Sequence, residues 1–132
     1  YEMDEQMCEI AIKKIEYLFG RRDIIVCNKY PQKYENADIL VLVNCAYADD
    51  CVTKNDYINK MLDFYIYAGK PKVFLLEVID PEYDIPDDNF PYCIRLTEND
   101  IRDMFPQASI HWYQTYRYPI NKRTKKLYVI QH

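Results

Sequence analysis

Two largely apolar segments of strand length constrain the fold more than any other feature of this sequence. Residues 39–43 are apolar without a break, and residues 72–79 form a second run of strand length. Strands that are apolar on both faces are typical of the centre of a parallel sheet. Between the two runs, Thr53 and Asp56 form a capping-box pattern ahead of residues 58–66, whose apolar positions fall on one side of a helix. A strand, a helix and a second strand in this order predict a parallel βαβ unit.

The remaining segments extend this unit into an α/β fold. Its expected form is a Rossmann-like, mostly parallel sheet with helices on both faces and a C-terminal antiparallel hairpin, in a single domain that spans residues 1–132. The other predicted elements are a helix at 7–19 with Asp4 as its cap and Gly20 as its stop, a short strand at 23–27, a helix at 97–105, and strands at 109–118 and 126–131.

Composition and charge exclude several classes of protein. The 132 residues carry a formal net charge of −4, which argues against non-specific nucleic-acid binding, and no apolar run is long enough to span a membrane. The five cysteines form no CxxC pair, so we expect reduced thiols in an intracellular, cytoplasmic protein without a disulfide framework. Two histidines suggest no metal site. The basic cluster at residues 122–126 is expected at an exposed hairpin tip.

A motif-like segment opens the chain, Glu2-Met3-Asp4-Glu5-Gln6-Met7-Cys8-Glu9-Ile10-Ala11. It resembles the part of class I S-adenosylmethionine-dependent methyltransferases in which an acidic residue at the tip of the second strand precedes a small capped helix. The resemblance implies that Glu2 binds the two ribose hydroxyls of S-adenosylmethionine and that Met3 packs on the adenine. The chemistry is suitable, because a carboxylate accepts two hydroxyl hydrogens and a thioether packs well against a flat ring.

The resemblance continues along the chain, and it implies further cofactor and substrate contacts. Asn28 follows the expected third strand, where the family places a polar residue against the adenine amino group. Asn44 follows the fourth strand, where the family contacts the methionine end of the cofactor, and Tyr47 and Asp49 are the implied substrate-binding residues. The segment from 97 to 131 resembles the last helix and the sixth and seventh strands of the family.

The family's glycine-rich first motif is absent from these residues, since Gly20 and Gly69 both stand at helix ends. The chain is therefore expected to be a methyltransferase-like domain that lacks its first strand, and the residues identify no catalytic group. Plainer interpretations of Glu2 as a solvated acid, Met3 as core, Asn28 as the cap of a turn and Asp49 as part of a solvated loop stay open.

Three functions follow. The first is methyl transfer from S-adenosylmethionine to an unidentified substrate, with the protein mainly positioning the reactants. The second is a catalytically inactive methyltransferase-like domain that serves as a binding or scaffold subunit, favoured by the missing glycine loop and by fourteen tyrosines suited to a protein interface. The third is an inactive caspase-like domain, because residues 37–76 resemble the central strands of that family without its histidine and cysteine.

Overall fold

The computed structural model describes residues 1–2, 4–43, 50–81, 94–117 and 124–132. It divides into two compact units, Tyr1–Tyr34 and Glu35–His132.

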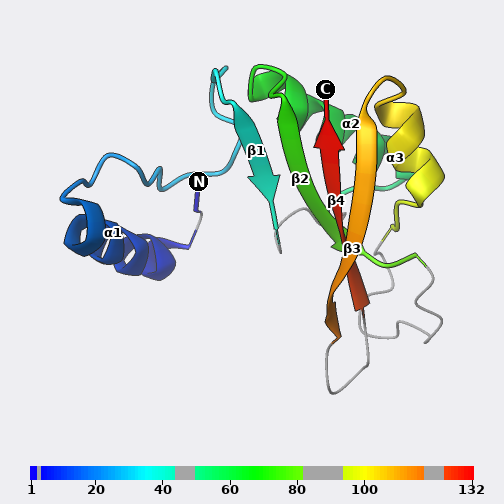
Figure 1. Cartoon of the computed structure of the whole chain (residues 1–132). Coiled ribbons are helices and arrows are strands. Elements are labelled where there is room, and N and C mark those ends of the chain that lie inside the picture. The colour runs from blue at the N-terminus through cyan, green and yellow to red at the C-terminus, as the bar shows by residue number, and fades with distance from the viewer. Residues whose placement is uncertain (3, 44–49, 82–93, 118–123) are drawn as a thin grey trace. The chain divides into compact units, whose positions relative to one another are not determined.

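The larger unit is built on a four-stranded sheet with the order β1-β2-β4-β3 (Figure 1). Its strands are β1 (Ile39–Leu42), β2 (Val73–Ile79), β3 (Ser109–Arg117) and β4 (Thr124–Gln131). β1 and β2 are parallel, whereas β4 is antiparallel to both of its neighbours, so that β3 runs in the same direction as β1 and β2. The predicted parallel pair and terminal hairpin are confirmed. The sheet is nevertheless an open mixed one with a single parallel pair, because β4 inserts between β2 and β3 instead of capping the edge.

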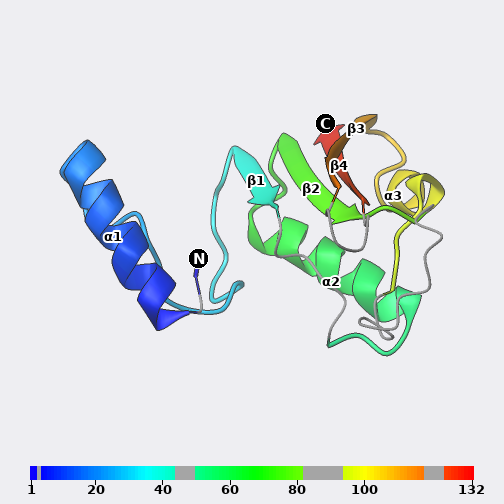
Figure 2. The same cartoon turned by 90° about the horizontal axis from the view of Figure 1, so that it is seen from below.

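The two helices of this unit, α2 (Lys54–Tyr67) and α3 (Glu98–Met104), begin as their sequences predict. In each, a threonine accepts a hydrogen bond from the third helical N–H and the aspartate at that position accepts from the threonine N–H. The pairs are Thr53 with Asp56 and Thr97 with Asp100. Both helices lie on the same side of the sheet (Figure 2).

The core lies between this helix layer and one face of the sheet. The side chains of Phe74, Leu76 and Tyr128 are fully buried there. The register sets Leu40 opposite Phe74 and Tyr128 opposite Leu76, so the buried side chains share one face. Burial of apolar area of this kind is the main stabilising contribution.

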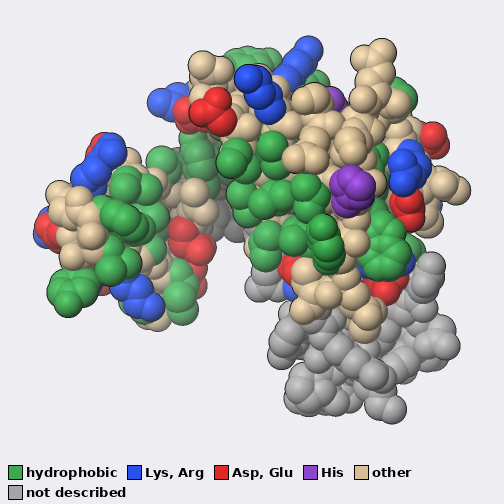
Figure 3. All heavy atoms as spheres, viewed as in Figure 1, with side chains coloured by type: hydrophobic (Ala, Val, Ile, Leu, Met, Phe, Trp, Pro, Cys, Tyr) green, Lys and Arg blue, Asp and Glu red, His purple; other side chains and the backbone are tan. Residues whose placement is uncertain are grey.

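The opposite face of the sheet is apolar and half-exposed. Ile39, Val41 and Val43 remain between 45% and 55% exposed. Figure 3 shows hydrophobic side chains gathered on this face over β1 and β2. Helices on both faces were expected, but α2 and α3 both cover the other side, and within the described part of this unit no further helix is present.

The smaller unit contains α1 (Glu5–Phe19), which Asp4 caps and which ends at Gly20 in the left-handed conformation. The expected strand at 23–27 is reduced to one parallel bridge between Glu2 and Cys27, because that bridge is the only pairing that the described residues provide for it. The expectation of reduced cysteines is also wrong, since Cys8 and Cys27 form a disulfide. Sequence gives no sign of this pairing, because it depends on the return of the chain past the first turn of α1.

A tight backbone approach accounts for Gly69, and it yields a first prediction. Gly69 has φ of +87°, and an added Cβ would lie 2.6 Å from the carbonyl oxygen of Glu35. Gly69→Ala is therefore expected to lower the free energy of unfolding by roughly 2 kcal/mol or more, from the left-handed backbone and the clash together. Urea unfolding monitored at Trp112, the single tryptophan of the chain, measures this change.

Gly20→Ala is the matched control. Gly20 also has a positive φ, of +65°, but no atom lies within 4 Å of its added Cβ. Only the backbone term applies there, so the substitution is expected to cost less than Gly69→Ala, about 1 kcal/mol. Equal effects of the two substitutions at this probe would contradict the close approach.

Candidate functional site

Glu2 lies beside the segment that contains Asn28. The Glu2 N–H donates to the Val26 carbonyl over 2.9 Å, and the parallel bridge pairs Glu2 with Cys27. Asn28 is thus one residue beyond the position opposite Glu2. Glu2 and Asn28 therefore lie at or just beyond the carboxyl ends of two short parallel segments. The carboxyl ends of parallel strands are where α/β folds present ligand-binding groups.

The Glu2 carboxylate is half-buried and points to the start of α1. Its Oε1 accepts a hydrogen bond from the Asp4 N–H at 3.0 Å, and Asp4 Oδ1 accepts one from the Met7 N–H at 2.9 Å. Two carboxylates in succession therefore satisfy backbone donors near the helix N-terminus, where negative charge is favourable.

Asn28 has local partners that suit the plainer interpretation. Its Oδ1 accepts from the Lys29 N–H at 2.8 Å, and its amide donates to Gln32 Oε1 at 3.3 Å. Gln32 in turn donates to the Lys29 carbonyl over 2.6 Å. The Asn28 side chain thus braces the turn that follows the bridge, and an adenine amino group would have to share its Oδ1 with the Lys29 N–H.

The resemblance implies four further site residues. Met3, Asn44, Tyr47 and Asp49 all lie outside the described residues.

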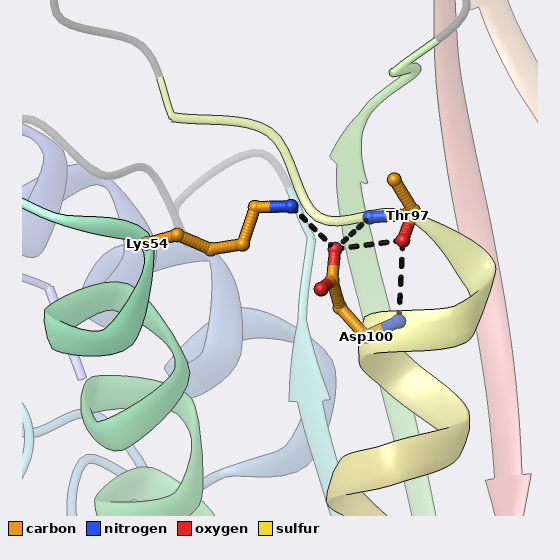
Figure 4. Close-up of polar contacts among 3 residues, drawn as sticks. All are labelled: Lys54, Thr97 and Asp100. Carbon is orange, nitrogen blue, oxygen red and sulfur yellow. Dashed lines mark hydrogen bonds and ion pairs between the residues drawn. The ribbon is translucent and has the colours of Figure 1, made fainter.

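The first turns of α2 and α3 meet at a polar cluster in the larger unit (Figure 4). Lys54 Nζ lies 3.0 Å from Asp100 Oδ2, which also accepts from the N–H and the hydroxyl of Thr97, at 2.7 Å each. The end of α2 bonds to the start of β1, since the Ala37 N–H donates to the Ala68 carbonyl. The start of α2, and with it this cluster, therefore points toward the carboxyl ends of the parallel strands.

The charge of Asp100 is stabilised in the folded state. Burial raises the pKa of the Asp100 carboxyl, but the hydrogen bonds from Thr97 and the nearby Lys54 ammonium together outweigh burial and lower that pKa below its ordinary value. The cluster therefore acts as an anchor that joins two helix N-termini.

This lowered pKa gives a second prediction. A group whose folded pKa is depressed adds stability above its unfolded pKa, near 3.9, and that stability is lost as the pH falls through the folded value. Asp100→Asn is expected to cost about 1 kcal/mol of unfolding free energy at pH 7, the usual effect of a lost cap. The difference from the unsubstituted protein should shrink below pH 4, as its own Asp100 becomes protonated.

Urea unfolding at pH 7 and pH 3 measures both values. Asp103→Asn is the control, because Asp103 is exposed on the same helix. An effect of Asp100→Asn that is equally large at both pH values would contradict the assigned role of the charge.

Two buried ion pairs lie at the carboxyl end of β2, and sequence reasoning missed them. Lys125 Nζ lies 3.4 Å from Glu77 Oε2, and Lys126 Nζ lies 3.3 Å from Asp80 Oδ1, with all four side chains at most 8% exposed. The prediction of an exposed basic tip is wrong for both lysines, because they belong to β4 in the middle of the sheet. The single acid in the apolar run of β2, Glu77, was the available signal.

Each pair is supported by neighbouring polar groups. On the half-exposed face, the Thr115 hydroxyl donates to Glu77 Oε1 over 2.6 Å. On the helix side, Lys126 Nζ lies 4.4 Å from the centre of the Trp112 ring, a cation–π distance, and Trp112 Nε1 donates to Glu98 Oε2 over 3.1 Å. The pairs are structural by their contacts, since both charges of each are neutralised inside the protein.

The described residues limit the chemistry of the site. They contain no cluster of three or more His, Cys, Asp or Glu side chains that could hold a metal ion. Burial raises the pKa of the Cys51 thiol, which makes it a poor nucleophile at neutral pH. In the part of the chain that the structure describes, no helix is long and apolar enough to cross a membrane.

The chain has no match among protein-family models, curated proteins or solved structures.

Proposed function

We propose that this chain is an S-adenosylmethionine-binding domain of the Rossmann-like methyltransferase type, which transfers a methyl group to an unidentified substrate. The observation that carries the proposal is the parallel pairing of Glu2 with Cys27. It brings the proposed ribose-binding acid next to Asn28, and the two residues are 26 positions apart in the sequence.

The strand pairings within each of the two units support the proposal. In doubly wound folds the second and third strands are neighbours, as are the fourth and fifth, and the first strand lies in the centre. The Glu2–Cys27 bridge has the relation of a second to a third strand, and β1 with β2 has that of a fourth to a fifth. The terminal hairpin, with β3 parallel in direction to β2, takes the place of the sixth and seventh strands.

In this proposal the protein positions the reactants and leaves the bond-making to the cofactor. A nucleophile of the substrate attacks the methyl carbon of the sulfonium, and the thioether leaves with the electron pair of the broken bond. Glu2 would accept hydrogen bonds from both ribose hydroxyls, with its carboxylate held by the Asp4 N–H. Such positioning accounts for a large part of the rate when two reactants must meet.

The role of Glu2 makes a third prediction. Glu2→Gln retains an oxygen for the Asp4 N–H but removes the charge that strengthens the hydroxyl contacts. Bonds to charged groups contribute about 1.5–3 kcal/mol, so the affinity for S-adenosylhomocysteine is expected to fall about tenfold to a hundredfold. Isothermal titration calorimetry measures the change.

Glu5→Gln is the matched control, because Glu5 is a nearby exposed acid in the first turn of α1. It is expected to bind as the unsubstituted chain does. Unchanged binding in Glu2→Gln would remove Glu2 from the site.

A second candidate function is that of an inactive, methyltransferase-like binding or scaffold subunit in a larger complex. The half-exposed apolar side chains of Ile39, Val41 and Val43 favour it, since exposed apolar patches commonly mark interaction surfaces. An absence of any binding to S-adenosylmethionine, together with an intact fold, would favour this function over the first.

A further inference from the structure

The smaller unit is held together by few buried contacts. Among residues 5–19, which form α1, only Cys8 is buried, and Tyr17, Leu18 and Phe19 are each at least 64% exposed. The ion pairs of Arg21 and Arg22 in this unit are exposed, so they contribute little. Helices of this length are marginal in water unless other contacts support them. The covalent link that Cys8 makes is therefore expected to contribute much of the order of α1.

The disulfide joins three segments at one point. Cys8, in the first turn of α1, is bonded to Cys27, which pairs with Glu2 through the parallel bridge. Cys8 Sγ also lies 3.5 Å from the Glu2 carbonyl oxygen. A link between residues 19 positions apart restricts the unfolded chain, and here it also fixes the helix against the bridge.

The two sulfurs differ in access. Cys8 is 3% exposed, whereas Cys27 belongs to the exposed residues. A thiolate from solution can therefore reach Cys27 before Cys8, and thiol–disulfide exchange depends on that access.

We propose that thiol–disulfide exchange at Cys8–Cys27 switches the smaller unit between a form in which α1 is tied to the Glu2 bridge and a form in which α1 is released. In reduction, a glutathione thiolate attacks the Cys27 sulfur and the Cys8 thiolate leaves and takes up a proton. A second glutathione thiolate then attacks the glutathione sulfur of the mixed disulfide, which frees Cys27 as a thiol and yields glutathione disulfide. Oxidation by glutathione disulfide is the reverse of these two steps, and each direction exchanges one disulfide and two thiols.

The switch also bears on the proposed cofactor site, and this part rests on the proposed function. Release of α1 would loosen the Glu2 backbone, whose N–H is bonded to Val26 and whose carboxylate is bonded to Asp4. Binding of S-adenosylhomocysteine should then be weaker in the reduced form.

Hydrogen exchange of the full chain in glutathione buffers of different redox ratio tests the switch. The chain carries Cys45→Ser, Cys51→Ser and Cys93→Ser, so that Cys8 and Cys27 are the only thiols, and alkylation before mass analysis reports their state. The amide protection of residues 8–19 is expected to fall at least tenfold on reduction, while that of β2 and β4 stays constant. Cys27→Ser and Cys8→Ser should each show the low protection in every buffer.

Equal protection of residues 8–19 in the reduced and oxidised chains would overturn the proposal, as would a failure of Cys8 and Cys27 to pair in the oxidising buffer. Full protection in Cys27→Ser would do the same. Because exchange is measured without cofactor, a redox-dependent α1 with no binding of S-adenosylhomocysteine would uphold the switch and count against the methyltransferase function alone.

Discussion

Glu77→Ala is expected to lower the free energy of unfolding by about 3–5 kcal/mol. The substitution leaves the ammonium of Lys125, whose side chain is 4% exposed, without the carboxylate that lies 3.4 Å away. Removal of one partner from a buried ion pair is strongly destabilising, because it takes away an opposite charge that offsets the desolvation of the other partner. The Thr115 hydroxyl loses its acceptor as well. Urea unfolding followed at Trp112 measures the change.

The double substitution Glu77→Leu with Lys125→Leu separates charge from packing. Replacement of both partners by apolar groups is often neutral or stabilising, so this variant should be much more stable than Glu77→Ala. Arg102→Ala, which breaks the exposed pair with Glu98, should behave as a surface substitution. A loss of less than about 1 kcal/mol in Glu77→Ala would show that Lys125 finds other solvation, contrary to the burial described above.

Phe74→Ala is expected to cost a similar amount, about 3–5 kcal/mol, through the cavity that it leaves. Phe74 is fully buried, and its ring lies 6.1 Å from that of Tyr65 and 6.0 Å from that of Phe105, measured between ring centroids. The side chain thus joins β2, α2 and the end of α3. Thermal unfolding monitored by circular dichroism should show a correspondingly lower Tm.

Val41→Ala is the matched control for this cavity. Val41 belongs to the neighbouring strand, but it points to the other face and is 53% exposed. Its truncation should cost well under half as much as that of Phe74, because little buried area is lost. Comparable losses at the two positions would indicate that the half-exposed face is buried in solution.

The sequence was informative where local pattern and packing agree. The two apolar runs predicted β1 and β2, and the helix pattern between them predicted their parallel pairing, because strand, helix and strand in this order form a βαβ unit. Thr53 and Thr97 marked the starts of α2 and α3, because capping is a local interaction among four residues. The hairpin of β3 and β4 was also predicted.

Features that depend on long-range pairing could not be predicted in the same way. A lysine-rich segment is normally solvated, and the burial of Lys125 and Lys126 depends on Glu77 of β2 and on Asp80, which directly follows β2. The disulfide of Cys8 with Cys27 and the insertion of β4 between β2 and β3 likewise follow from how distant segments meet.

In the candidate site, too, the local pattern could be predicted from the sequence and the tertiary contacts could not. The motif at Glu2 and the position of Asn28 after a short apolar run were visible in the sequence, and the bridge between Glu2 and Cys27 brings the two residues together. The bonds of Asn28 to its own turn were not visible, because they depend on the conformation of residues 28–32.

Calorimetric titration of S-adenosylmethionine and S-adenosylhomocysteine into this chain, and into a version extended upstream of Tyr1, tests the central claim most directly. Saturable binding of both compounds is expected. The binding should be tightest in a version that carries a strand and a glycine-rich turn before Glu2, and it should weaken in Glu2→Gln. Binding of neither compound by either version, with the fold intact by circular dichroism, would contradict the methyltransferase assignment.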